Sequence, residues 1–387
     1  MPVAVPSFRP ALRTRVATAA AAVAAATLFA SAPAATAAGV GLASHQAGAP
    51  VFVQTDNTTA NTVVAYHRSA DGTLSQRGVY PTGGRGGMLD GSVVDHLASQ
   101  GSLAYDTRHR LLYAVNAGSD SLTVFAVHGD ALERLQEIPS DGRFPVSVTF
   151  HDNRVYVLNA LDGGSIQGFV RTGNGLRGVD SWHRGLGLDP QATPQFTHTP
   201  GQISFTPDGS KLVVTTKAGA NSIDVFGTGR SGAPSARPVV TSTPNAVPFG
   251  FAFDRAGRLQ VTEAGPNAVE TFVLHPDGRL TPVQQVLTGQ AATCWVVVTG
   301  RHLYASNAGS GTLSGYRVGP RLTALGTTAT DPGTVDAAAS SDGRTLYVQT
   351  GAAGIVDEFR VNADGSLTAI GSVTVPGAVG GEGIAAG

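Results

Sequence analysis

The sequence predicts an all-β chain folded as a seven-bladed β-propeller. Six copies of one pattern begin at residues 101, 145, 200, 248, 292 and 334, so that successive starts lie 42 to 55 residues apart. Repeats of that length, each holding several short strands, are typical of propeller blades. Within a copy, apolar and polar residues alternate between Asp-Gly, Asn-Ala-Gly or Gly-Ser turns, which indicates half-buried strands. No window has the sustained periodicity of a helix.

The seventh blade is assembled from the two ends of the propeller. Residues 51–84 match the second and later strands of a repeat but lack its first strand, and residues 381–387 (GEGIAAG) resemble only that first strand. We therefore expect Gly383–Ala386 to pair beside Val51–Thr55. Such a pairing would close the ring and cover two strand edges that otherwise promote aggregation.

Residues 1–37 have the pattern of a secretory signal peptide. Three arginines lie in the first 15 residues, an Ala-rich apolar run covers Val16–Ala30, and Ala35-Thr36-Ala37 offers a small-residue cleavage site. The apolar run is shorter than the ~20 residues that a membrane-spanning helix needs. A retained N-terminal anchor is the alternative to cleavage.

We therefore divide the chain into a signal peptide at 1–37, a linker at 38–50 and the propeller at 51–387. The expected location is the extracellular medium or the cell envelope, without membrane insertion after cleavage. Removing the three arginines of the leader takes the formal net charge from −1 to −4. Nucleic-acid binding needs a clustered basic stripe, so we expect no nucleic-acid partner, and we expect a monomer.

Several kinds of chemistry have no support in the sequence. It contains no G-x-S-x-G, H-E-x-x-H, C-x-x-C or Walker motif, and its ten histidines are scattered singly. We therefore expect no metal and no cofactor. The single cysteine, Cys294, excludes an intrachain disulfide and lies in an apolar strand, where a buried, unreactive thiol is expected.

Candidate site residues follow from the register of the repeat. In a propeller the first strand of each blade starts, and the second strand ends, at the face where the central channel opens. The two longest connections, 83–100 and 184–199, reach the same face, where functional loops are expected. The strand starts supply Gln100, Arg143, His198, Gln202, Phe249, Trp295, Asp336 and Glu382, and the strand ends supply Asp56, Asn116, Asn159, Lys217, Glu263, Asn307 and Gln349.

These positions differ in how easily the fold alone explains them. The three asparagines precede turns, so hairpin capping explains them. Trp295 suits core packing as well as ligand stacking. Glu263 takes the position that asparagine fills in other blades, and Lys217 is one of two lysines in the chain. Neither turn demands a charge, which makes both residues candidates for function.

The units LLYAVNAGSDSLTVF (111–125) and ISFTPDGSKLVV (203–214) resemble those of the seven-bladed lactonase-like propellers. That family includes bacterial 6-phosphogluconolactonase and the carboxy-muconate cyclases, and the stretches at 99–103 and 294–298 look like a secreted branch. The resemblance covers the whole predicted propeller. It implies the same fold and a lactone-opening activity.

The family's catalytic pattern is incomplete in this chain. Where family members start one inner strand with Pro-His-x-His, this chain has His198 nearby and Gln202 at the second position. Where they read Gly-Pro-Arg-His, it has Val247-Pro248-Phe249-Gly250, without the Arg-His pair. Glu263 matches the acidic position of the pattern. The missing pair argues against a phosphorylated substrate, which favours a cationic clamp.

Two functions remain open at this point. As an enzyme, the protein would hydrolyse or isomerise a small lactone without a redox cofactor, and whether it is an enzyme stays undecided. Glu263 or His198 would act as general base, Arg143 or Lys217 would stabilise the oxyanion, and the substrate would contact Gln100, Gln202, Phe249, Trp295, Asp336 and Glu382. The alternative is a non-catalytic scaffold that binds an extracellular protein, peptide or glycan through the same mouth.

Overall fold

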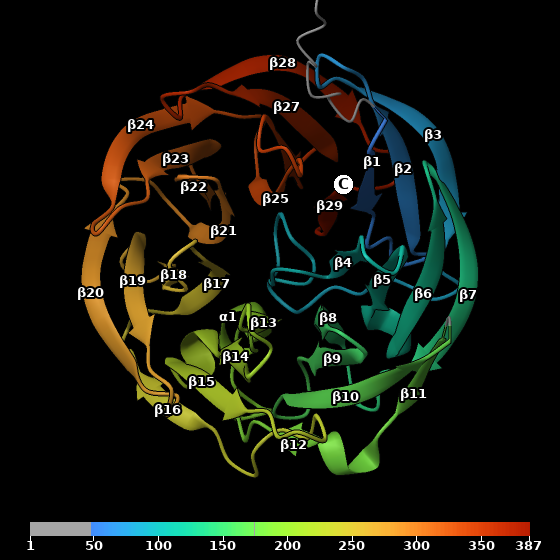
Figure 1. Cartoon of the computed structure of the whole chain (residues 1–387), viewed down its shortest axis with the longest axis vertical. Coiled ribbons are helices and arrows are strands. Elements are labelled where there is room, and N and C mark those ends of the chain that lie inside the picture. The colour runs from blue at the N-terminus through green and yellow to red at the C-terminus, as the bar shows by residue number, and fades with distance from the viewer. Residues whose placement is uncertain (1–47, 174) are drawn as a thin grey trace, which may run out of the picture. The chain divides into compact units, whose positions relative to one another are not determined.

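The computed structural model describes residues 48–173 and 175–387. The predicted signal peptide, 1–37, and nearly all of the predicted linker lie outside the described residues. Within the described part, seven antiparallel sheets surround a central axis as the blades of a propeller (Figure 1). The predicted fold class is therefore confirmed. No helix of these residues is long and apolar enough to cross a membrane.

Each blade runs from an innermost first strand to an outermost fourth strand. Blade 1 contains β29 (Ile384–Ala386), β1 (Pro50–Gln54), β2 (Thr62–Arg68) and β3 (Leu74–Pro81); blade 2 contains β4 (Leu103–Asp106), β5 (Leu111–Asn116), β6 (Ser121–His128) and β7 (Ala131–Pro139). Blade 3 contains β8 (Pro145–His151), β9 (Arg154–Asn159), β10 (Ser165–Thr172) and β11 (Gly175–Gly178), with β12 (Arg184–Gly185) also paired to β10; blade 4 contains β13 (Gln202–Phe205), β14 (Lys211–Thr215), β15 (Ser222–Gly227) and β16 (Val239–Ser242).

The remaining three blades follow the same order. They contain β17 (Pro248–Phe253), β18 (Leu259–Glu263), β19 (Ala268–Leu274) and β20 (Leu280–Leu287) in blade 5, β21 (Thr293–Thr299), β22 (His302–Asn307), β23 (Thr312–Arg317) and β24 (Thr323–Ala329) in blade 6, and β25 (Thr334–Ala339), β26 (Thr345–Thr350), β27 (Ile355–Val361) and β28 (Leu367–Thr374) in blade 7. The helical elements are short: η1 (Ala117–Ser119), η2 (Asp180–Trp182), α1 (Gln195–His198) and η3 (Lys217–Gly219).

The two ends of the propeller share blade 1, as the sequence predicts. The antiparallel register joins Val51 to Ala386 and Val53 to Ile384, so β29 supplies the first strand that the N-terminal segment lacks (Figure 1). Backbone pairing between distant parts of the chain closes the ring. Without β29, the strand β1 would keep its pairing with β2 but expose its other edge.

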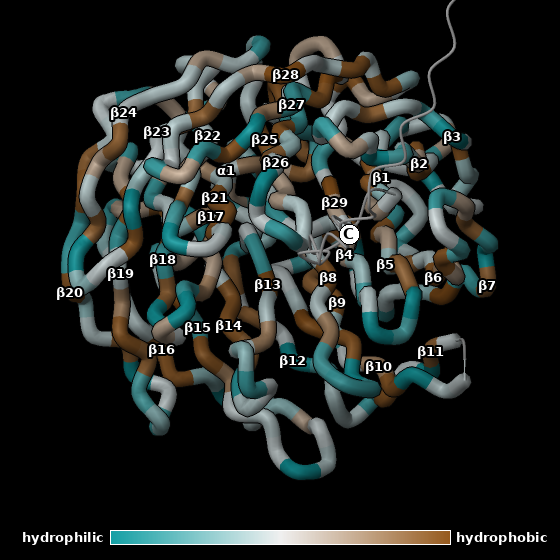
Figure 2. The backbone as a smooth tube through the Cα atoms, turned by 45° about the horizontal axis from the view of Figure 1, so that its top comes forward, coloured by the Kyte–Doolittle hydropathy of each residue, from teal (hydrophilic) through white to brown (hydrophobic). Residues whose placement is uncertain are grey.

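The strand patterns follow from the packing of blades against one another. Second strands such as β5 and β26 are buried at every position because neighbouring blades cover both of their faces. The outer strand β3 is mostly exposed after its first residue. Apolar stretches lie along the strands and hydrophilic ones in the turns (Figure 2). The core therefore consists of layers between blades, such as Val225 of blade 4 against Phe251 of blade 5.

Buried tyrosines on the second strands of blades 3, 6 and 7 bind each of these blades to the next one. The hydroxyl of Tyr304 donates to the carbonyl of Gly365 over 2.8 Å, and that of Tyr347 donates to the carbonyl of Gly72 over 2.7 Å. Tyr156 makes the equivalent contact in blade 3. A buried tyrosine hydroxyl needs a partner, and the turn of the next blade provides it. This contact explains why the repeat retains tyrosine at this place.

The strand register defines two faces. The start of a first strand pairs with the end of the second, as in Thr293 with Asn307 and Thr334 with Thr350. We call this side the mouth face, and we call the opposite side, where first and second strands are joined by turns, the far face. All the candidate positions taken from the repeat belong to the mouth face.

Candidate functional site at the mouth face

The connection between β3 and β4 fills the mouth of the channel. Its residues 89–102, called the plug below, run into the middle of the ring (Figure 1). Across the channel in blade 6, the Trp295 indole donates to the Ser99 carbonyl over 2.5 Å. The Gln100 amide exchanges hydrogen bonds of 2.9 and 3.0 Å with the Val296 backbone. The plug, although it is a loop, is therefore tied to a blade on the other side of the channel.

Lys217 is a buried cation that holds the plug. Its side chain is 1% exposed, and Nζ donates to the carbonyls of Ala98 and Phe196, each over 2.6 Å, and to the Thr199 hydroxyl over 3.1 Å. It also lies 5.3 Å from the centre of the Phe249 ring, a cation–π distance. An ammonium has three donors, and here all three bind protein oxygens. Lys217 therefore has no free N–H to offer to a ligand.

Four carboxylates, each at most 5% exposed, surround the inner end of the plug: Asp56, Asp95, Asp336 and Glu382. Glu382 accepts from the backbone N–H of Gly101 over 2.9 Å, and Asp56 accepts from the backbone N–H of Glu382 over 2.8 Å. Asp95 accepts from two N–H groups of the plug, over 2.8 and 3.0 Å. Within the described residues these acids form no group that could hold a metal ion. Their hydrogen bonds connect the plug with the closing strand of the ring.

Burial shifts the pKa value of each of these groups in the direction that favours its uncharged form. It raises the pKa of Asp95 to about 6, that of Asp336 to about 7 and that of Asp56 to about 8. Burial, followed by the nearby Asp336 carboxylate, raises the pKa of Glu382 well above its usual range. Burial lowers the pKa of Lys217 to about 7, although the Asp95 carboxylate opposes that change. Asp95, with the lowest of these carboxyl pKa values, is the carboxylate best suited to be ionised near neutral pH.

An apolar cavity of about 270 Å³ lies beside the plug. Phe196, Phe249 and Trp295 form its walls, and the last two rings meet edge to face with centroids 4.9 Å apart. Cys294 also lines the cavity, and burial raises the pKa of its thiol to about 12. Asp95 supplies the one carboxylate among the described lining residues, and none of them is a lysine, arginine or histidine. We call this space the aromatic cavity.

The two predicted glutamines serve the scaffold. Gln100 binds the backbone of β21, as described above, and Gln202 Oε1 accepts from the backbone N–H of Phe251 in the next blade over 2.6 Å. Neither residue lines the aromatic cavity. Of the six residues predicted to contact substrate, Phe249 and Trp295 reach this cavity, whereas the two glutamines, Asp336 and Glu382 hold the structure around it.

Glu263 lies inside blade 5, apart from the aromatic cavity. It is 1% exposed and accepts a hydrogen bond of 2.6 Å from Gln285 of β20. Burial, followed by the adjacent Glu263 carboxyl group, raises the pKa of Glu270 on β19 to about 8. The structure thus places Glu263 in a pair of carboxyl groups within the blade.

His198 and Arg143 are also outside the cavity. The His198 ring at the end of α1 lies 2.9 Å from the Thr197 hydroxyl and 3.0 Å from the Pro194 carbonyl. The Arg143 side chain is 61% exposed and lies 3.5 Å from Asp162. The structure therefore does not bring the four predicted catalytic residues together.

Two of the three predicted asparagines, Asn116 and Asn307, make the hairpin contacts expected from their positions before turns. Asn116 donates to Thr123 in its own hairpin over 2.9 Å, and Asn307 donates to Ser314 over 3.0 Å. Both side chains are fully buried. They cap hairpins and offer no group to a ligand.

Asp95 and Phe196 line the cavity but are not among the residues predicted from the sequence. They lie in the two long connections, 83–100 and 184–199, where functional loops were expected. The repeat fixes the orientation of strand residues but says nothing about which loop side chains turn inward. Asp95 could have been proposed from the sequence because it is an acidic residue in the longest connection at the mouth face.

The family described as "Lactonase, 7-bladed beta-propeller" matches residues 42–175 and 260–381, more than half of the chain. The chain belongs to this family. The predicted resemblance is thereby confirmed, and the protein is a lactonase-like propeller. A search among curated protein sequences finds no match.

Similar solved structures support the fold. A periplasmic gluconolactonase from Pseudomonas aeruginosa has a TM-score of 0.71 at 18% identity, covering 87% of this chain and 98% of its own. A proposed 6-phosphogluconolactonase from Bacteroides uniformis has a TM-score of 0.73 at 18% identity, covering 88% of this chain and 100% of its own. At such identities the likeness shows the shared fold alone.

Proposed function

We propose that this protein hydrolyses a small, uncharged lactone in the aromatic cavity. The observation that carries the proposal is the presence of one carboxylate, Asp95, in an otherwise apolar cavity at the mouth of a lactonase-like propeller. Cavities of this kind, apolar with a few polar groups, are typical ligand sites. The names of the similar structures, a gluconolactonase and a proposed 6-phosphogluconolactonase, support a lactone as the substrate class.

Asp95 is the general base in this proposal. In its ionised form it removes a proton from a water molecule, whose oxygen attacks the lactone carbonyl carbon. The tetrahedral intermediate then breaks the bond between the acyl carbon and the ring oxygen, and Asp95 returns the proton to that oxygen. The product is the open hydroxy acid, and the step needs no redox cofactor. The proposal thus moves the base from Glu263 or His198 to a residue that lines the cavity.

Lys217 is a positioning residue in the same scheme. Its ammonium binds Ala98 and Phe196, which flank the cavity, and its positive charge favours the ionised form of Asp95. In a water-poor site, a fixed positive charge also favours the oxyanion that forms during attack. Replacing it would disturb both the plug and the protonation of Asp95.

The cavity walls indicate the substrate class. A phosphate or carboxylate group on the substrate favours an arginine or lysine partner, and no described lining residue supplies one. The three aromatic side chains suit an alkyl or aromatic ring. We therefore expect an apolar lactone such as dihydrocoumarin to be a better substrate than 6-phosphogluconolactone.

A lactone panel tests this function. Purified protein should hydrolyse dihydrocoumarin and alkyl δ-lactones, and Asp95→Asn should lower kcat by roughly 10²- to 10⁴-fold. Asp90→Asn, which changes an exposed acid in the same plug, is the matched control and should retain the rate. Hydrolysis no faster than in buffer, or an unchanged rate in a folded Asp95→Asn protein, would overturn the proposal.

A second candidate is a non-catalytic scaffold that binds a protein, peptide or glycan at the mouth face. Val93 of the plug is 82% exposed and Val379 is 59% exposed. A backbone hydrogen bond of 2.9 Å from His96 to Gly380 brings their segments together. Exposed apolar side chains near each other are typical of contact surfaces. A partner captured by the wild type but not by Val93→Asp, together with no lactone turnover, would favour this reading.

We also infer export of the protein, on the pattern of residues 1–37. Mass spectrometry of protein from the culture medium should give a mature chain that starts near Ala38. Full-length chains confined to the cytoplasm would contradict export. Size-exclusion chromatography with light scattering tests the expected monomer.

A further inference from the structure

We propose that the far face carries a second binding site, for a phosphate group on a small organic molecule, formed by Arg255, Arg301 and Arg317. These arginines line a cavity of about 540 Å³ at the turns of blades 5, 6 and 7. The site lies on the opposite side of the propeller from the aromatic cavity. The inference is independent of the proposed lactone hydrolysis.

The strand geometry directs these arginines to one place. His302 and Arg317 are direct partners in the register of β22 and β23, so their side chains lie on the same face of that hairpin. Arg255 comes from the neighbouring blade, and its Nη2 atom lies 4.0 Å from the position that a Cβ atom would take at Gly300. Arg301 follows Gly300 directly. The guanidinium groups of two blades therefore border one hollow.

The three arginine side chains form no ion pair or hydrogen bond within the described part of the chain. One acid, Asp342, lines the cavity, but Arg68 binds it from another side over 3.1 Å. The whole chain has a formal net charge of −1, so three arginines around one cavity are a local excess and not part of a generally basic surface. Such an excess of unpartnered charge favours an anionic ligand.

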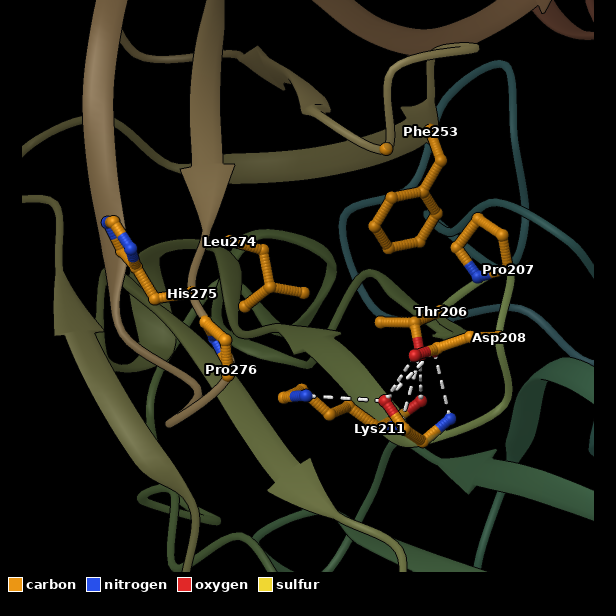
Figure 3. A pocket seen from close by; sticks show the side chains of 10 residues that line it. Thr206, Pro207, Asp208, Lys211, Phe253, Leu274, His275 and Pro276 are labelled. Atoms are coloured by element: carbon orange, nitrogen blue, oxygen red, sulfur yellow. Dashed lines mark hydrogen bonds between the residues drawn. The ribbon is translucent and has the colours of Figure 1, made fainter.

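A second hollow on the far face provides a comparison, because the charged side chains of its turns have hydrogen-bond partners. It lies between blades 4 and 5, and its Asp208 accepts from the Thr206 hydroxyl over 2.6 Å and from the Ser210 hydroxyl (Figure 3). Lys211 donates to Ser210 over 3.2 Å (Figure 3). Each charge there has a partner within its own turn. The arginine-lined cavity differs because it offers its donors to solvent.

The chemistry of the donors indicates the ligand. Planar guanidinium groups bind phosphate oxygens in pairs, and three of them can surround one phosphate group. His302 borders the same cavity; burial and then the charge of Arg317 lower its pKa, and a bound phosphate would oppose that effect. The cavity volume leaves room for an attached group of sugar size. A sugar phosphate therefore fits better than a bare phosphate ion.

Titration calorimetry on the mature protein tests the site, with glucose 6-phosphate, inorganic phosphate and glucose as probes. We expect saturable binding of glucose 6-phosphate, weaker binding of phosphate, and none of glucose. The double variant Arg301→Gln, Arg317→Gln should weaken glucose 6-phosphate binding by at least about tenfold. Arg108→Gln is the control, because that side chain is 80% exposed at a turn of the same face in blade 2 and should leave binding unchanged.

A second readout separates this site from general charge attraction. The NMR signal of the His302 ring should shift on adding glucose 6-phosphate to the wild type and stay constant in the double variant. No saturable binding, or equal affinity in wild type and a folded double variant, would overturn the proposal. So would equal binding of glucose and glucose 6-phosphate. Neither experiment measures lactone turnover, so a negative result for phosphate binding leaves the mouth-face proposal unaffected.

Discussion

The two faces of the propeller both collect charged side chains from several blades, but they use them differently. At the mouth face, Lys217 and Glu382 are buried and bind the backbone of the plug and its neighbours. At the far face, Arg301 and Arg317 are exposed and have no partner within the described residues. Similar sequence signals thus have different consequences. A cation at a ring position offers an N–H group to a ligand only if the fold has not already used its donors.

The largest difference between the faces should appear when the closing strand is removed. Deletion of residues 381–387 removes β29 and the Glu382 carboxylate together, and it exposes the edge of β1. We expect a loss of more than about 4 kcal/mol in the free energy of unfolding, or no cooperative folding. Urea denaturation measures it. The far-face double variant is the comparison, and an equally small loss in both proteins would contradict the role of the closing strand.

The two lysines provide the next comparison. Lys217→Met removes a buried cation and leaves Asp95 and the Ala98 carbonyl without it, which should cost about 3–5 kcal/mol. Lys211→Met changes a partly exposed lysine that binds Ser210, and it should cost less than about 1 kcal/mol. Equal losses in the two variants would show that Lys217 does not hold the plug.

The buried acids predict an unusual dependence of stability on pH. The pKa values of Asp336 and Asp56 in the folded protein, about 7 and 8, lie above the ordinary 3.8. The folded state therefore binds more protons between about pH 4 and 8, and stability falls as pH rises through that range. Lys217, with a lowered pKa of about 7, has the opposite effect between about pH 7 and 10.5.

Melting temperatures measured from pH 5 to 9 test this balance. The melting temperature of the wild type should fall between pH 5 and 8, as Asp336 and Asp56 lose their protons in the folded protein. Asp56→Asn should flatten this loss, whereas Asp277→Asn, at an exposed far-face turn, should retain it. A wild-type stability that rises steadily over this range would contradict the buried cluster.

The smallest effect is expected at the exposed mouth residue Arg143. Its side chain is 61% exposed and its contact with Asp162 spans 3.5 Å. Arg143→Gln should change the free energy of unfolding by less than about 0.5 kcal/mol and leave lactone turnover unchanged. A large loss of turnover in this variant would place Arg143 in the active site and contradict the assignment of the site to the aromatic cavity.

Much of this fold follows from the sequence because the repeat sets both strand register and strand order. The pairing of Val51 with Ala386 was predictable from a missing strand at one end and a matching one at the other. The site was predictable only in part. Phe249 and Trp295 reach the cavity, but Asp95 lies in a loop whose path depends on contacts with Lys217 and Trp295 in distant blades.

The direct test of the central claim, that the lactone binds in the aromatic cavity, is the fluorescence of Trp295. The chain has two tryptophans, and Trp182→Phe removes the other one, which stacks on Tyr156 in blade 3. Adding dihydrocoumarin to a Trp182→Phe, Asp95→Asn protein should change Trp295 emission saturably, at concentrations near the KM of the wild type. Unchanged Trp295 emission at concentrations that saturate wild-type turnover would contradict the account.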